Sequence, residues 1–151
     1  MSFTVRDPIS INRMYGTGKG RFFLTKEGRE FKHRVLAAAL VARASSAWPA
    51  DPFLVAKARL SYDLYDYRGD SDGPCKALRD CLEGVLYVND RVVEDGPHPL
   101  PVKDGGGRRV VVTVELLHYR SPAEAEAERV KHRQRAELRA KRRAAKKLKS
   151  V

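Results

Sequence analysis

The sequence has few of the features that mark secreted, membrane-spanning or disulfide-bonded proteins. Only 2 of its 151 residues are cysteine, and Cys75 and Cys81 face different sides of a predicted helix, where they cannot bridge each other. We therefore expect a reducing, intracellular compartment and no zinc site. No apolar run approaches the ~20 residues that span a bilayer, and residues 1–6 lack the basic and apolar regions of a signal peptide. These absences predict a cytoplasmic protein without a membrane partner.

Positive charge is concentrated near the C-terminal end. Residues 120–151 contain 12 Lys and Arg against 4 Glu, a net charge of +8, whereas residues 1–119 contain 18 Lys and Arg against 15 Asp and Glu, a net charge of +3. A basic extension of this kind is typical of segments that bind polyanions, although a solvated helix that aids solubility has the same composition. The charge predicts one folded domain over residues 1–119 and a basic helical extension over residues 120–151.

Hydrophobic periodicity predicts an α+β fold. The expected strands are residues 3–5, 54–64, 86–94 and 110–117, and the expected helices are residues 26–46, capped by Thr25, residues 74–85 and the tail from Pro122. Residues 8–20 and 95–107 are expected to be loops, the second one mobile because it holds three prolines and four glycines. Two core helices can then cover one face of a mixed sheet in two layers. The opposite face stays free for a ligand or a second subunit.

Three carboxylates fall where two of the predicted strands end. Asp70 and Asp72 follow the long strand two residues apart, so that they project to the same side of an extended chain. Asp90 lies at the tip of the next strand, and all three gather at one sheet edge if the two strands pair. Such oxygen ligands suit Mg²⁺, with water and a phosphate in the remaining positions. A bound ion of this kind polarises phosphoryl oxygens and lowers the pKa of an attacking water.

Lys76 adds a cation to this predicted site. It follows Asp72 by one helical turn, where its ammonium can stabilise charge that grows on a phosphate, and Asp80 lies one further turn along to hold it. The alternative is that Asp72 caps the helix, Lys76 and Asp80 form a surface pair and Asp90 is a turn residue. The spacing excludes an EF-hand, an aspartyl-phosphate phosphatase and a phosphate-binding glycine loop.

Three blocks, in order, resemble the RusA family of Holliday-junction resolvases, which are common in bacteriophages and prophages. Residues 8–15 (Pro-Ile-Ser-Ile-Asn-Arg-Met-Tyr) and 25–31 are similar to the opening of the family pattern. Residues 70–84 (Asp-Ser-Asp-Gly-Pro-Cys-Lys and the following helix) resemble its Asp-x-Asp-Asn-x-x-Lys motif, and residues 87–93 resemble its aromatic-x-Asp-Asp-x-x-Val motif. Together the blocks span roughly residues 3–118.

This resemblance implies a homodimeric, Mg²⁺-dependent endonuclease, with Mn²⁺ as an alternative ion and no small-molecule cofactor. It would nick four-way DNA junctions symmetrically in a bacterial or phage-infected cytoplasm. Asp70, Asp72 and Asp90 match the metal-binding acids, and Lys76 matches the catalytic lysine. Gly73 replaces the usual Asn, and Asn89 replaces the first of two acids. The residues expected to bind DNA are Asn12, Arg13, Lys19, Arg21, Lys76, Arg139, Lys141, Arg142 and Arg143.

Two other functions remain open from the sequence. One is a non-catalytic nucleic-acid-binding accessory protein, in which the tail binds the backbone and the three acids are incidental. The other is a nuclease that acts mainly on forks or flaps. Histidines 33, 98, 118 and 132 are scattered along the chain, so we expect each to be structural or on the surface, and no Ser–His or Cys–His constellation for nucleophilic catalysis is evident.

Overall fold

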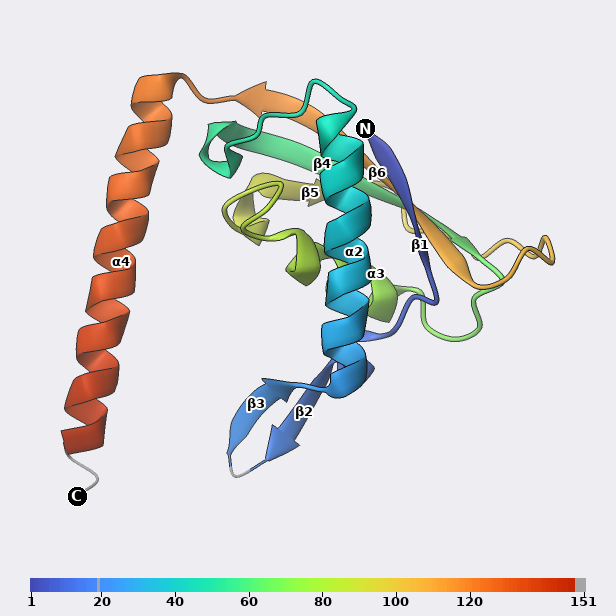
Figure 1. Cartoon of the computed structure of the whole chain (residues 1–151), viewed down its shortest axis with the longest axis horizontal. Helices are drawn as coiled ribbons and strands as arrows, with labels where there is room; N and C mark the ends of the chain where they lie inside the picture. Colours follow the sequence, from blue (N-terminus) through green and yellow to red (C-terminus); the bar gives the residue numbers. More distant parts are fainter. Residues whose placement is uncertain (19, 149–151) are drawn as a thin grey trace. The chain divides into compact units, whose positions relative to one another are not determined.

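Residues 1–18 and 20–148 form an α+β fold in the computed structural model (Figure 1). The chain divides into two compact units, Met1–Tyr119 and Arg120–Val151. The strands are β1 (Ser2–Arg6), β2 (Tyr15–Gly18), β3 (Arg21–Leu24), β4 (Val55–Tyr65), β5 (Val93–Asp95) and β6 (Arg109–Tyr119). The helices are α1 (Ile11–Met14), α2 (Lys26–Ala44), α3 (Asp72–Leu82) and α4 (Pro122–Leu148), with short 3₁₀ turns η1 (Pro52–Leu54) and η2 (Asp90–Val92).

A mixed four-stranded sheet forms the centre of the first unit. Its strand order is β1-β6-β4-β5, in which β5 runs parallel to β4 and the other neighbours are antiparallel. Alternate residues of the sheet are buried, such as Val110, Val112 and Val114 of β6, and they share one core with Phe31 and Val35 of α2 and with the apolar side of α3. The predicted α+β class with a mixed sheet is therefore confirmed, as is the Thr25 cap, whose side chain accepts a hydrogen bond from the Gly28 backbone N–H.

The long strand β4 departs from simple alternation at its start. The sequence predicts that Leu54 and Ala56 share the buried face with Ala58, but both are only partly buried and Val55 is fully buried instead. The pairing with β6 shifts register between Val55 and Ala58. Such a bulge adds one residue to one strand and turns the residues before it to the other face. Beyond the bulge, the predicted alternation holds.

Two segments differ from the predicted elements. Residues 15–18 and 21–24 form the antiparallel pair β2–β3, whereas the sequence predicts a loop over residues 8–20. Residues 86–88 are buried, as an apolar strand would be, but they join no strand of the sheet, and only Val93–Asp95 of the predicted strand does so. Side chains hold this stretch in place, since the Tyr87 hydroxyl donates to the Arg79 carbonyl at 2.8 Å and Trp48 Nε1 donates to the Leu86 carbonyl at 3.2 Å.

Strand β5 runs parallel to β4. The chain that follows β5 therefore leads toward the C-terminal end of β4, and the residues just before β5 come from the direction of its start. Residues 96–102 continue beside β4 toward its C-terminal end, where the Val102 N–H donates to the Leu64 carbonyl and the Asp66 N–H donates to the Val102 carbonyl, both at 2.8 Å. The predicted mobile loop is thus anchored by backbone hydrogen bonds.

The second unit consists of the helix α4. Its first turn forms a capping box, in which Ser121 Oγ accepts from the Glu124 N–H and Glu124 Oε2 accepts from the Ser121 N–H. This pairing satisfies two backbone donors that a helix start leaves unbonded. In the described part of the chain, no helix combines the length and the apolar character needed to cross a membrane.

Candidate functional site

Asp70, Asp72 and Lys76 come together at the start of α3. The Asp72 N–H donates to Asp70 Oδ1 at 3.0 Å, which closes the turn before the helix and holds the Asp70 carboxylate against the backbone of Asp72. Lys76 Nζ lies 2.5 Å from Asp72 Oδ2, one helical turn on. The hydrogen bond from Lys76 lowers the pKa of Asp72, and the same bond raises the pKa of Lys76. The cluster therefore contains an ionised Asp72 beside a protonated amine.

His98 lies at the same place, which the sequence did not predict. Ser71 Oγ and His98 Nε2 are 2.8 Å apart and share a hydrogen bond, and Ser71 is buried whereas His98 is exposed. The charge of His98 also contributes to the lowered pKa of Asp72. His98 is exposed, as expected of a surface histidine, and its contact with Ser71 is a feature that the sequence does not indicate. The chain after β5 follows β4 to its C-terminal end and brings His98 to Ser71. The position of His98 therefore depends on the parallel pairing of β5 with β4, which the sequence does not indicate.

Asp90 does not join this cluster within the chain. It opens the 3₁₀ turn η2, ahead of Val93, which pairs with Ala58 in the first half of β4. The start of α3 instead lies near Tyr62, whose pKa is raised by burial and by the nearby Cys75. Ala58 and Tyr62 are four strand residues apart, roughly 13 Å at the usual rise. The predicted convergence of three acids fails because the paired strand begins after Asp90, whereas the sequence predicts that Asp90 lies at its tip.

Asp95 is the acid of β5 that approaches the start of α3. Its Oδ1 accepts from Arg79 Nη2 at 2.7 Å. Burial raises the pKa of the Cys75 thiol to about 12, and the charges of Asp72, Asp95 and Asp70 raise it further. All three carboxylates therefore act on one thiol of α3. The sequence offered no signal for Asp95, because its position depends on the register of β5.

The donor set fits a divalent cation held by two carboxylates. Among residues 1–18 and 20–148, no group of three His, Cys, Asp or Glu side chains is placed to hold a metal ion. Mg²⁺ in phosphoryl-transfer sites is commonly held by one or two carboxylates, several waters and the substrate phosphate. Asp70 and Asp72 supply such a pair, with Lys76 beside it, whereas a cage made only of protein ligands is absent from the described residues.

The alternative assignment is wrong for Asp72 and for the pair of Lys76 with Asp80, whereas Asp90 does lie in a turn, at the start of η2. Ser71, not Asp72, occupies the cap position of α3, and no side-chain capping bond is made there. Lys76 pairs with Asp72 and not with Asp80. Asp80 instead accepts a hydrogen bond from the Tyr15 hydroxyl at 3.4 Å, so the predicted support of Lys76 by Asp80 is wrong.

Gly73 marks a close approach between α3 and the segment before α1. A Cβ atom at Gly73 would lie 2.9 Å from Ser10 Cβ and 3.4 Å from Ser10 Cα, and real Cβ atoms are almost never found at the shorter distance. There is no room for a side chain at this position, and the close approach fixes the start of α3 against residues 10 and 11.

The predicted DNA-binding residues near the N-terminus differ in their surroundings. Arg13 forms an ion pair with Glu27, and its Nε donates to Glu27 Oε2 at 3.2 Å, so part of its charge is compensated. Asn12 and Arg21 are exposed, and no hydrogen bond or ion pair of the Arg21 side chain occurs among the described residues. Lys19 lies outside the residues that the structure describes.

The predicted DNA-binding residues of α4 lie in its second half. Early in the helix the cations have acidic neighbours, and Glu126 pairs with both Arg129 and Arg133. Arg139, Lys141, Arg142 and Arg143 are all exposed, and in the described chain they have no acidic partner. Because residues three and four apart share a helix face, the arginines at 139, 142 and 143 form one basic stripe.

Comparison with known proteins adds no assignment. Neither a scan against models of protein families nor a search of curated proteins finds a match for the chain. The features that indicate a function are therefore the acid pair with its lysine, the adjacent histidine and the basic helix.

Proposed function

We propose that the chain is a divalent-metal-dependent endonuclease that cuts branched DNA, with the four-way junction as its principal substrate. The single observation that carries this proposal is the Asp70, Asp72 and Lys76 cluster at the start of α3. Two adjacent carboxylates suit a hard cation, and an ammonium within hydrogen-bond distance of one of them suits a phosphate that binds at the same place. The resemblance of residues 70–84 to the RusA motif points to the same chemistry.

In this proposal the side chains position and stabilise the phosphate. Asp70 and Asp72 would hold Mg²⁺, or Mn²⁺ in its place, and the ion supplies charge stabilisation and a water of lowered pKa. Lys76 keeps its proton at neutral pH because its pKa is raised, so it serves as a fixed positive charge and not as a base. The hydrogen bond between Ser71 and His98 holds the imidazole beside the acid pair, where it can accept a proton from water.

Attraction of DNA to an acidic centre requires positive charge elsewhere in the protein. The exposed stripe on α4 supplies it, because cations that neutralise phosphates release counterions and give most of the affinity for a duplex. A homodimer would carry two such centres, which suits paired cuts in a junction of matching two-fold symmetry.

The decisive experiment is cleavage of a synthetic four-way junction by the full chain, with Mg²⁺ and with a chelator. We expect symmetrical nicks only with the metal. Asp72→Asn should abolish cleavage and retain junction binding, since it removes a ligand and no DNA-facing cation. Asp90→Asn is the matched control, because it makes the same change in an exposed carboxylate of η2, outside the cluster. Equal loss of cleavage in both variants would contradict the assignment of the centre to the start of α3.

A non-catalytic DNA-binding protein is the second candidate, and the lack of a three-ligand group in the described residues favours it. It predicts salt-sensitive binding through α4 and no cleavage of any substrate with Mg²⁺ or Mn²⁺. Parallel assays on four-way, forked, flapped and linear DNA separate this candidate from a nuclease. They also show whether forks or flaps replace the four-way junction as the preferred substrate.

A further inference from the structure

The hairpin β2–β3 carries two exposed aromatic side chains at its outer end. The two strands pair only with each other in the described chain. Tyr15 and Leu24, at the base of the hairpin, pack against the core. Farther out, the side chains of Phe22 and Phe23 are 82% and 53% exposed, and Figure 1 shows the hairpin standing apart from the four-stranded sheet.

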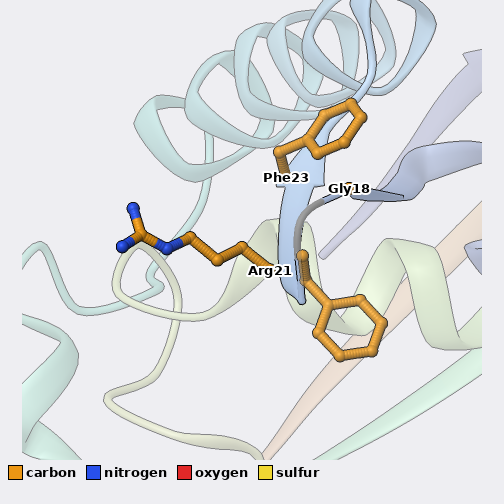
Figure 2. A pocket seen from close by; sticks show the side chains of 4 residues that line it. Gly18, Arg21 and Phe23 are labelled. Atoms are coloured by element: carbon orange, nitrogen blue, oxygen red, sulfur yellow. The ribbon is translucent and has the colours of Figure 1, made fainter. Parts of the chain in front are cut away.

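Phe23 gives the outer end a fixed shape. It lies opposite Gly16 in the ladder, and a Cβ atom at Gly16 would be 2.8 Å from Phe23 Cζ, so the ring occupies the space that a side chain would take. Gly18, Arg21, Phe22 and Phe23 line a shallow hollow (Figure 2). Phe22 points to the other face of the ribbon from Phe23, since strand neighbours alternate. One ring is thus packed and the other is free.

The charge of the hairpin selects the kind of partner. Residues 15–24 include Lys19 and Arg21 and no Asp or Glu, and Figure 2 shows the Arg21 side chain extending away from the strand. Aromatic rings that lie beside cations are suited to bind single-stranded nucleic acid, in which base faces are open and phosphates lie nearby. Four lining residues form too small a surface for a stable contact between two protein copies.

We propose that the end of the β2–β3 hairpin binds an unstacked nucleobase of DNA, with Phe22 against the base face and Arg21 at the neighbouring phosphate. The proposal rests on the proposed function, because it takes DNA as the ligand. It adds a reason for structure preference: paired and stacked bases in a linear duplex offer no open face, whereas a branch point or a single strand does.

The test measures binding in a chelator, so that cleavage plays no part. Fluorescence anisotropy with a single-stranded oligonucleotide, a four-way junction and a linear duplex gives three dissociation constants for each variant. Phe22→Ala should weaken binding of the single strand and the junction by roughly 5- to 150-fold, the effect of losing one base–aromatic stack, and should leave duplex binding nearly unchanged. Phe22→Trp should retain wild-type affinity, whereas Phe22→Leu should not.

Val41→Ala is the matched control, because Val41 is an apolar side chain of α2 that is 69% exposed, and it should bind all three ligands normally. Wild-type affinity in Phe22→Leu would overturn the proposal, since a stack needs a ring, and so would an equal loss on all three ligands. A change of molar mass in Phe22→Ala during sedimentation would overturn it in favour of a contact between copies. If the wild-type protein binds or cuts junctions and every Phe22 variant has the same dissociation constants, this inference is refuted and the proposed function stands. A wild-type protein that binds no DNA refutes both proposals.

Discussion

Replacement of Gly73 by Ala tests the packing that holds the candidate site in place. The added Cβ would lie 2.9 Å from Ser10 Cβ, and overpacking of this kind costs about 1–3 kcal/mol. Ala gains about 0.5–1 kcal/mol over Gly in a helix. The difference spans about 0–2.5 kcal/mol, and we expect a loss near its middle, about 1 kcal/mol of unfolding free energy, or roughly 3–6 °C in Tm for a unit of this size.

The assay is urea unfolding followed by tryptophan fluorescence. The chain has one tryptophan, and Trp48 is buried with its indole N–H bonded to the Leu86 carbonyl, so its emission reports loss of the core. Ser10→Gly removes the atom that the new methyl group would meet, and the double variant should recover about 1 kcal/mol relative to the sum of the single changes. Ser10→Ala keeps Cβ and should give no such recovery.

Two results would refute this reasoning. One is a Gly73→Ala variant as stable as the wild type within about 0.3 kcal/mol, and the other is strict additivity in the double variant. Either result would mean that the segment before α1 shifts to accommodate the added methyl group without a loss of unfolding free energy. The start of α3 would then not be fixed by Ser10.

Four other predictions concern the site, the core and the tail. Because Lys76 has a raised pKa and Asp72 a lowered one, their ion pair should persist between about pH 4 and pH 10; it is lost as the pH falls through the lowered pKa or rises through the raised one, and an NMR titration of Lys76 Nζ checks this. Tyr87→Phe should lower stability by about 1 kcal/mol in urea unfolding, since it removes a buried bond to the Arg79 carbonyl. Truncation after Tyr119 should weaken DNA binding and leave the circular dichroism and unfolding transition of the first unit intact. Alanine at the three arginines of the α4 stripe should lower the slope of log K against log salt by roughly 3; an unchanged slope would assign the tail to solubility or to a protein partner.

Local patterns in the sequence were sufficient to predict much of the fold. Thr25 and the apolar spacing after it predict α2, and alternation predicts most of β4, because these signals depend on neighbours within a few residues. The hairpin β2–β3 was missed because its glycines resemble a loop, although Gly16 serves to accommodate the Phe23 ring. The bulge in β4 has no sequence signature that alternation alone would reveal.

The candidate site was predictable only in its local part. Asp70, Asp72 and Lys76 lie within one turn and the following helix, so their proximity follows from spacing. Asp90 and His98 are placed by the direction of β5, which depends on long-range pairing with β4. The sequence predicts that the apolar residues before Asp90 pair in the sheet, whereas Val93–Asp95 does so. Asp90 therefore lies before the paired strand, and His98 follows it toward the end of β4.

The two native thiols have a practical consequence for labelling. Burial raises the pKa values of Cys75 and Cys81 to about 12, so their thiolate populations at neutral pH are roughly a thousandfold below that of an ordinary cysteine. A cysteine introduced at the exposed Arg91 would therefore react selectively with a maleimide dye in the otherwise native chain. That dye would sit in η2, outside the cluster that contains Lys76, where it could follow DNA binding by energy transfer without touching the chemistry.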